Sequence, residues 1–228
     1  MDSSNKRNLG DVSISNSDDP FNITSAFNVA ITPKYTTIIG ERKYFTDDEI
    51  KSIFNYIYSQ MKVLNRQIHA RYALVFMTQL FTGARVGEVL QLKPVDIDIQ
   101  QNTITLITEK KQQYPLPTRK MQLNPRLKDV WVSYALEFSI PIRSTEKIFN
   151  LTIQGINKYT HRITEATGIY VKSHKFRHTF AHKCDEAGFT VPQIGALLGH
   201  SSKNLSVTGE YLKYIGTEID LTKLRWEF

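Results

Sequence analysis

Apolar residues recur at the helical period along most of the chain, and the first such run starts near residue 46. Thr46 precedes Asp47, and Glu49 follows three residues after the threonine, which is the capping-box pattern that begins a helix. The apolar positions behind it share one helical face: Ile50, Ile53, Phe54, Ile57 and Tyr58. The pattern therefore predicts a long amphipathic helix that starts at Asp47.

Further segments follow the same period. They cover residues 69–81, 85–92, 125–138, 152–166, 174–187, 191–198 and 205–215. Gly83 separates the first two of these segments, and Pro94 ends the second. Gly188 and Gly199 follow the segments at 174–187 and 191–198, as glycines commonly do after a helix. The chain is therefore predicted to be mostly helical.

One stretch alternates instead of following the helical period. Residues 103–108 read Thr-Ile-Thr-Leu-Ile-Thr and are rich in β-branched side chains, which is typical of a strand. Residues 96–98 lead into it, a polar turn follows at 109–113, and residues 119–123 form the returning strand. The predicted fold is α+β, mostly helical with a small antiparallel β-sheet.

Three regions are expected along the chain. Residues 1–40, rich in Ser, Asn and Asp, form a flexible tail or arm in which residues 31–39 are ordered. Residues 41–216 form the main domain. In the last region, 217–228, Leu221, Leu224 and Phe228 recur at i, i+3 and i+7 with Trp226 beside them. This pattern predicts a short helical docking segment that needs a groove, because so short a helix is unstable alone.

Composition narrows the class of protein. The chain has 228 residues, 41% of them hydrophobic, and 29 basic against 22 acidic residues give a net charge of +7. This charge suits a polyanionic partner without proving one. The single cysteine, Cys184, excludes an internal disulfide and favours a reducing compartment. No run approaches the ~18 apolar residues of a membrane span. We expect a cytoplasmic protein with no membrane partner.

Arg85 stands in the run Thr-Gly-Ala-Arg-Val-Gly-Glu, with Glu88 three residues later. Two interpretations remain open: a surface ion pair with Glu88, or a guanidinium fork that binds two phosphate oxygens. His174 and Arg177 share a helix face next to lysines, which fits a solvated basic helix or a phosphate site. His178 and His182 lack the glutamate of a zinc-protease helix, so no metal site is predicted.

Two further candidates lie near the end of the chain. His200 follows Leu-Leu-Gly, so it either faces the dipole of the preceding helix or points from the helix exit into a cleft. Tyr211 and Tyr214 lie one helical turn apart. Tyrosines are usually packing residues, and a phenol with a pKa near 10 becomes a nucleophile only where cations surround it.

Taken in order, these motifs resemble the tyrosine recombinase (phage integrase) family over roughly residues 44–216. The matching pieces are Thr82–Leu90, Ser173–Ala181, Leu197–Ser202 and Thr208–Tyr211, with a basic β-hairpin between the first two. Each motif alone is moderate evidence, whereas all of them in this order are specific.

The resemblance implies a role for each candidate residue. Arg85 and Arg177 would hold the scissile phosphate, His174 would assist proton transfer and His200 would bond a phosphate oxygen. Tyr211 would be the nucleophile, with Tyr214 as the alternative. The remaining implied residues are the leaving-group acid Lys110 with Lys111 as its substitute, the supporting Glu88, and the DNA-binding lysines Lys111, Lys172, Lys175 and Lys203.

The implied function is site-specific DNA recombination through a covalent 3′-phosphotyrosyl intermediate, without metal, ATP or another cofactor. The implied partners are double-stranded DNA, further copies of the chain that assemble as a tetramer on paired sites, and an accessory protein. Relatives often pass the last segment to a neighbouring protomer; packing on its own domain is the alternative. Two other functions stay open: type IB topoisomerase-like relaxation and non-catalytic DNA binding.

Many members of this family carry a helical DNA-clamping domain ahead of the catalytic one. The forty polar residues at 1–40 are too few to form such a unit of about 100 residues. Three explanations remain open: a minimal single-domain recombinase, an excised fragment, or a clamp completed by another protein.

Overall fold

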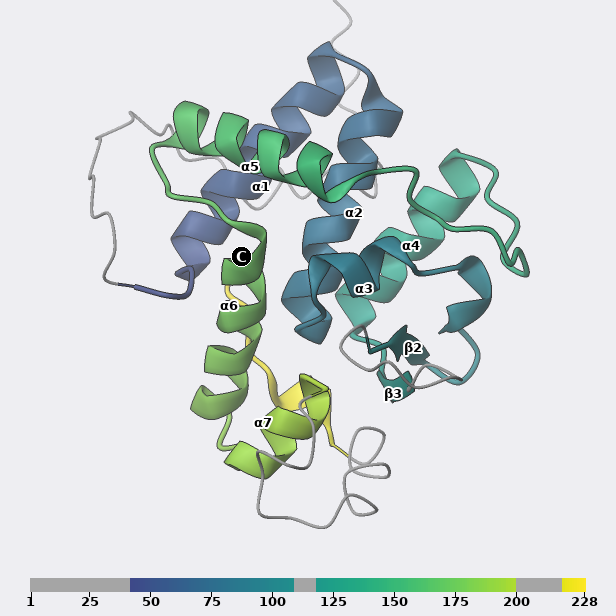
Figure 1. The fold of residues 1–228 in the computed structure, drawn as a ribbon, viewed down its shortest axis with the longest axis vertical. Helices are drawn as coiled ribbons and strands as arrows, with labels where there is room; N and C mark the ends of the chain where they lie inside the picture. Colours follow the sequence, from purple (N-terminus) through teal and green to yellow (C-terminus); the bar gives the residue numbers. More distant parts are fainter. Residues whose placement is uncertain (1–41, 109–117, 200–218) are drawn as a thin grey trace, which may run out of the picture.

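The computed structural model describes residues 42–108, 118–199 and 219–228 (Figure 1). Its helices are α1 (Asp47–Val63), α2 (Arg66–Thr82), α3 (Val86–Leu90), α4 (Pro125–Glu137), α5 (Ile153–Thr167), α6 (Ser173–Glu186) and α7 (Val191–Leu197), with 3₁₀ turns η2 (Pro94–Asp96) and η4 (Leu221–Lys223). The strands are β1 (Ile97–Asp98), β2 (Thr103–Ile107) and β3 (Thr118–Gln122). The predicted helices and strands between residues 42 and 199 that fall within these ranges are present. The predicted helix at 205–215 and the ordered part at 31–39 lie outside them.

Helix α2 is the centre of the fold (Figure 1). It packs against α1, α3, α4 and α6, and every residue from 73 to 82 is buried. A helix buried on all sides must be apolar or hydrogen-bonded all round, and α2 meets this with Phe76, Leu80 and Phe81 beside the bonded Gln79. At the start of α1, Thr46 and Glu49 form the predicted capping box.

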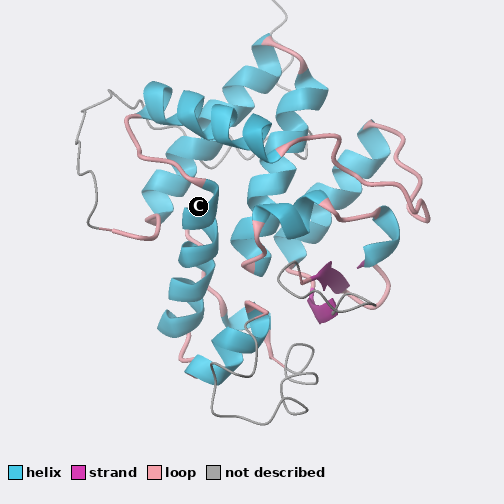
Figure 2. Ribbon diagram, viewed as in Figure 1, coloured by secondary structure: helices cyan, strands magenta, loops and turns pink. Residues whose placement is uncertain are grey.

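The sheet has three antiparallel strands in the order β1-β2-β3, one more than the predicted hairpin (Figure 2). The pairing sets Ile104 opposite Met121 and Leu106 opposite Arg119. Ile104, Leu106 and Met121 are buried, so Arg119 lies on the face of the sheet that is turned to the core. Lys120, on the other face, is exposed and donates to Gln101.

Gly83 ends α2 in the left-handed conformation, with a φ of +63°. A Cβ atom at this position would lie 2.5 Å from Cδ1 of Phe180 and 2.7 Å from Cδ2 of Leu198. Helix α6 and the end of α7 therefore pack directly on the backbone of the α2–α3 junction. Both the backbone conformation and the space require glycine here, and the close packing brings these elements to Arg85, two residues later.

The last ten residues differ from the prediction. Only η4 is helical, and from Leu224 onwards the chain is extended. Leu224 and Trp226 are buried while Arg225 and Glu227 are exposed, which is the alternation of an extended segment. The predicted helical stripe at i, i+3 and i+7 is therefore wrong.

In this single chain the segment packs on its own domain. Trp226 meets the ring of Phe81 edge-on with 5.0 Å between centroids. Arg126 donates to the backbone oxygens of Trp226 and Phe228 at 3.1 and 2.6 Å. Transfer of the segment to a neighbouring protomer stays a prediction, because a single chain does not test it.

The packing of Trp226 gives a test of this arrangement in solution. Trp226→Ala removes an indole buried against Phe81, so it should lower the free energy of unfolding by about 3 kcal/mol. The exposed neighbour supplies the control, since Arg225→Ala should change it by less than about 0.5 kcal/mol. Chemical denaturation of the monomer measures both. Equal, small effects of the two substitutions would mean that the segment does not rest on its own domain.

Candidate active site

Arg85 is held at the start of α3 by the glutamate that follows it. Nη1 of Arg85 donates to Oε1 of Glu88 at 3.0 Å, and the backbone N–H of Arg85 donates to Oε2 at 2.9 Å. One fifth of the Arg85 side chain is exposed. The pairing with Glu88 expected from the sequence is therefore present. It orients the guanidinium without burying it.

Glu88 is fully buried and serves two arginines. Its Oε2 also accepts from Nη2 of Arg119 on β3 at 2.7 Å. Burial raises the pKa of Glu88, but the hydrogen bonds and charges of Arg119 and Arg85 outweigh burial and hold this pKa below its ordinary value. The carboxylate is therefore ionised at neutral pH.

Arg177 is buried and joins three parts of the chain. From α6 its Nη1 donates to the carbonyl oxygen of Gly83 at 2.6 Å, and its Nη2 donates to that of Leu198 at 2.7 Å. Burial, followed by the positive charge of Arg85, lowers the pKa of Arg177 to about 9, while Glu88 acts in the opposite direction. The guanidinium thus stays charged at neutral pH, in a fixed orientation.

These residues form a cluster of three arginines around one carboxylate: Arg85, Arg119, Arg177 and Glu88. The positive charges of Arg85 and Arg119 both lower the pKa of Arg177, so Arg177 is repelled by two like charges. One carboxylate neutralises only one of them. A partly buried surplus of positive charge is costly, and an anion at the exposed side of the cluster would relieve it.

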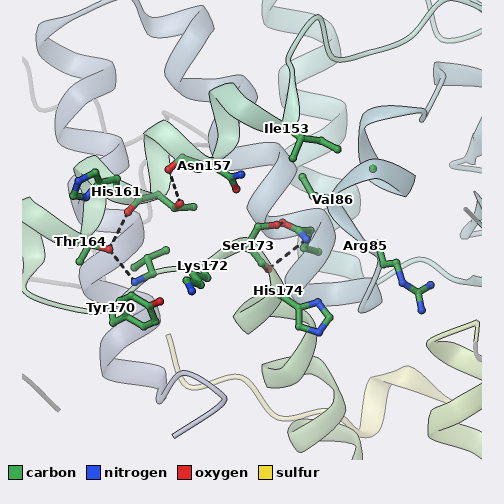
Figure 3. Close-up of a pocket in the computed structure, with 14 residues that line it drawn as sticks. Arg85, Val86, Ile153, Asn157, His161, Thr164, Tyr170, Lys172, Ser173 and His174 are labelled. Carbon is green, nitrogen blue, oxygen red and sulfur yellow. Dashed lines mark hydrogen bonds between the residues drawn. The ribbon is translucent and has the colours of Figure 1, made fainter. Parts of the chain in front are cut away.

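A cleft of about 700 Å³ opens beside this cluster. It lies between α3, α5 and the start of α6. Figure 3 shows Arg85 and His174 together at one end of the cleft, with Thr164 and Tyr170 at the other. His174 is exposed, and its ring contacts that of His178 edge-on. The predicted pair Arg85 and His174 therefore meets at one site although 89 positions separate them in the sequence.

A buried hydrogen-bond pair positions the start of α6 against α2. The hydroxyl of Ser173 donates to the side-chain oxygen of Gln79 at 2.9 Å. The side-chain nitrogen of Gln79 lies 3.3 and 3.4 Å from the carbonyl oxygens of Ala84 and Ser173. Gln79 therefore fixes Ser173, and with it His174, relative to the backbone that carries Arg85.

Two of the lysines that are predicted to bind DNA, Lys172 and Lys175, lie within the described residues, and only Lys172 lines the cleft. Lys172 is exposed, lines the cleft and lies 5.0 Å from the ring centre of Tyr170. Lys175 is half-buried and lies 4.6 Å from the ring centre of Phe45, and it does not line the cleft. Burial is the main cause that lowers the pKa of Lys175. A contact of either lysine with DNA stays a prediction.

The other predicted site residues lie outside the described residues: Lys110, Lys111, His200, Lys203, Tyr211 and its alternative Tyr214. Within residues 42–108, 118–199 and 219–228, no group of three His, Cys, Asp or Glu side chains is placed to hold a metal ion. In the same ranges, no helix is long and apolar enough to cross a membrane.

Arg119 and Gln79 were not predicted from the sequence. For Arg119 a signal existed: it precedes Met121 and Leu123 by two and four residues, so a strand places an arginine on the same face as two apolar side chains. A charged residue on a buried face needs a partner. For Gln79 the signal was weaker, an amide within the mostly apolar second half of α2.

Comparison with known proteins places the chain in a family. Residues 43–214 match the phage integrase family. The chain is 29% identical over 174 residues to the putative integrase/recombinase y4qK of Sinorhizobium fredii, covering 72% of this chain and 52% of that protein. It is 26% identical over 200 residues to the tyrosine recombinase XerC of Staphylococcus aureus (strain JH9), covering 83% and 62%. The chain thus spans about half to three fifths of these relatives.

The fold is also similar to solved structures. The XerH site-specific recombinase bound to difH substrate superposes with a TM-score of 0.55 at 22% identity, over 72% of this chain and 49% of that chain. The XerA recombinase gives a TM-score of 0.52 at 22% identity, over 83% and 65%. The predicted fold class is confirmed. On its sequence match and its fold, the chain belongs to the phage integrase family and has the catalytic-domain fold of the tyrosine recombinases.

Proposed function

We propose that this protein cleaves and rejoins DNA at specific sites through a covalent 3′-phosphotyrosyl intermediate. The observation that carries the proposal is the cluster of three arginines around the single carboxylate of Glu88, at the end of a cleft shared with His174. Its surplus positive charge suits one phosphodiester. Arg85, whose side chain is partly exposed, supplies the planar fork that binds two phosphate oxygens.

In this mechanism the arginines act on the charge that develops at phosphorus. The phenol oxygen of Tyr211 forms a bond to phosphorus, the bond to the 5′-oxygen breaks, and the phenol proton leaves with help from His174. Lys110 donates a proton to the departing 5′-oxygen. Guanidiniums held in advance by Glu88 and by backbone carbonyls need no reorganisation when the phosphorane forms, which is the source of electrostatic catalysis.

The second half of the reaction reverses the first. A 5′-hydroxyl from a partner strand attacks the phosphotyrosyl ester, and the tyrosine leaves. Because one ester replaces another, the bond energy is kept and the reaction needs no ATP. His200 would bond a non-bridging phosphate oxygen in both halves. Lys110, His200 and Tyr211 lie outside the described residues, so their roles come from the family motifs alone.

The proposed partner is double-stranded DNA. Exchange between two sites requires several copies of the chain, and we propose a tetramer on paired sites. An accessory protein is a further proposed partner. Lys111, Lys172, Lys175 and Lys203 would contact the DNA backbone. A cytoplasmic location belongs to the same proposal. It is supported by Cys184, which is the one cysteine of the sequence, so the chain forms no internal disulfide.

The nucleophile is tested with a nicked suicide duplex, whose cleaved end is lost so that the covalent adduct accumulates. The wild-type chain should give a protein–DNA adduct that resists denaturation, and Tyr211→Phe should give none because the attacking oxygen is removed. Gel electrophoresis in denaturant measures the adduct, with Tyr214→Phe as the control. An adduct formed by Tyr211→Phe and lost in Tyr214→Phe would move the nucleophile to Tyr214.

The two arginines should act mainly on the transition state. Arg85→Ala and Arg177→Ala should each raise the barrier to adduct formation by about 3–4 kcal/mol, while the exposed Arg143→Ala leaves the rate unchanged. DNA affinity should fall far less, because other basic residues supply most phosphate contacts. Arg177→Ala should also lower the free energy of unfolding by about 1–3 kcal/mol, since it leaves two buried carbonyls unpaired.

Single-turnover cleavage at saturating DNA and DNA titration separate these effects. Losses in affinity as large as the losses in rate would make both arginines ordinary DNA anchors.

The purified wild-type protein also serves to distinguish the alternative functions. Relaxation of supercoiled DNA without exchange between paired sites would favour the topoisomerase-like reaction. Binding with no adduct would favour a non-catalytic relative.

A further inference from the structure

Arg119 is a largely buried cation on the hairpin that no catalytic role accounts for. It lies on β3 opposite Leu106, two residues from the buried Met121, and only 10% of its side chain is exposed. An arginine in such a place loses much of its hydration. It is tolerated only where fixed partners replace the lost water.

The partners of Arg119 belong to the arginine cluster. Its Nη2 donates to Oε2 of Glu88 at 2.7 Å, and its Nη1 lies 3.5 Å from Oγ1 of Thr108, at the limit of a hydrogen bond. Its Nε is buried and has no hydrogen-bond partner among the described residues. Arg119 is therefore bound mainly through Glu88.

Glu88 divides its two oxygens between Arg119 and Arg85. Oε1 accepts from the Arg85 side chain, whereas Oε2 accepts from Arg119 and from the Arg85 backbone. The carboxylate is thus held from both sides, which fixes its rotation. If Arg119 were absent, Glu88 could turn, and the direction of the Arg85 guanidinium would turn with it.

The same guanidinium supports the chain at the end of α7. A Cβ atom on Gly199 would lie 2.9 Å from Nη1 of Arg119 and 3.4 Å from its Cδ and Cζ. Gly199 has a φ of +67°, so both its backbone conformation and its contact with Arg119 require glycine. The backbone at Gly199, just before His200 in the sequence, therefore lies close against the Arg119 side chain.

We propose that Arg119 is a positioning residue that aims Arg85 at the phosphodiester through Glu88 and supports the turn at Gly199. This inference rests on the proposed function, because it names a residue that serves the same reaction without touching the DNA. This role requires an arginine rather than another cation. A guanidinium reaches both Glu88 and the backbone at Gly199 from one rigid planar group, whereas a lysine at this place provides a charge and donors on a single flexible point and cannot bridge the two.

The first test compares Arg119→Met and Arg119→Lys with Lys120→Met in the full chain. Lys120 is the matched control, since it is the next residue of β3 and points to solvent. Arg119→Met should slow single-turnover adduct formation on the nicked duplex by about 100-fold, the scale of a lost electrostatic contact in the transition state. Arg119→Lys should slow it by about 10-fold. Lys120→Met should react at the wild-type rate.

The second test asks whether Arg119 acts through Arg85. A methylphosphonate at the scissile position has no negative charge, so it has little need of the Arg85 guanidinium. On this substrate the rates of wild type and Arg119→Met should differ by less than about 10-fold, against about 100-fold on the phosphodiester. A purely structural role would slow both substrates equally.

Every result of these two tests either supports or contradicts the positioning role of Arg119. Wild-type rates for both Arg119 variants, or equal slowing on the two substrates, would overturn the positioning role. If Arg119→Met does not fold in a denaturation experiment, the folded Arg119→Lys decides alone: slowed reaction on the phosphodiester only supports the role, and a wild-type rate contradicts it. A wild-type chain that forms no adduct would instead refute the proposed function, and the inference with it.

Discussion

The buried carboxylate of Glu88 is the constraint on which the rest of the site depends. From α3 it binds Arg85 within its own helix turn and Arg119 on β3, and it is the only carboxylate among the described residues that bonds the arginine cluster. Breaking a buried charge pair by removing one partner typically costs about 3–5 kcal/mol, because the other charge is left without compensation. The position of Arg85 is therefore coupled to the stability of the fold around it.

The packing around Glu88 brings together the α2–α3 junction, α6, the end of α7 and β3. Gly83 lets α6 and α7 rest on the α2–α3 junction, and Arg177 joins that junction to the end of α7 through two carbonyl bonds. Gly199 then rests on Arg119 from the sheet. Each close approach occurs at a glycine in the left-handed conformation, where a side chain would be excluded both by space and by the backbone. Arg177 is thus oriented by backbone carbonyls, whereas Arg85 and Arg119 are oriented by the carboxylate of Glu88.

The sequence predicts interactions between residues that are close together in the chain, but not those between residues that are far apart in it. Helix limits followed from capping residues such as Thr46, and the Arg85–Glu88 pair followed from its i, i+3 spacing. The pairing of Glu88 with Arg119 spans 31 positions and depends on the register of β2 with β3, which residue spacing does not give. The apolar spacing of the last segment fits a helix as well as a turn followed by an extended chain, so the sequence did not distinguish them. The alternation of buried Leu224 and Trp226 with exposed Arg225 and Glu227 does.

The role of Glu88 is tested most directly by measuring the free energy of unfolding of wild type and of Glu88→Gln as a function of pH. At neutral pH the substitution should cost about 3–5 kcal/mol, since it removes a fully buried carboxylate from between two partly buried arginines. The pKa of Glu88 is held below its ordinary value in the folded chain, so this stabilisation is complete above that ordinary value and is lost as pH falls through the folded-state pKa. The two stability curves should therefore converge in acid. A difference below about 1 kcal/mol at neutral pH, or one that does not change with pH, would contradict the central place given to Glu88.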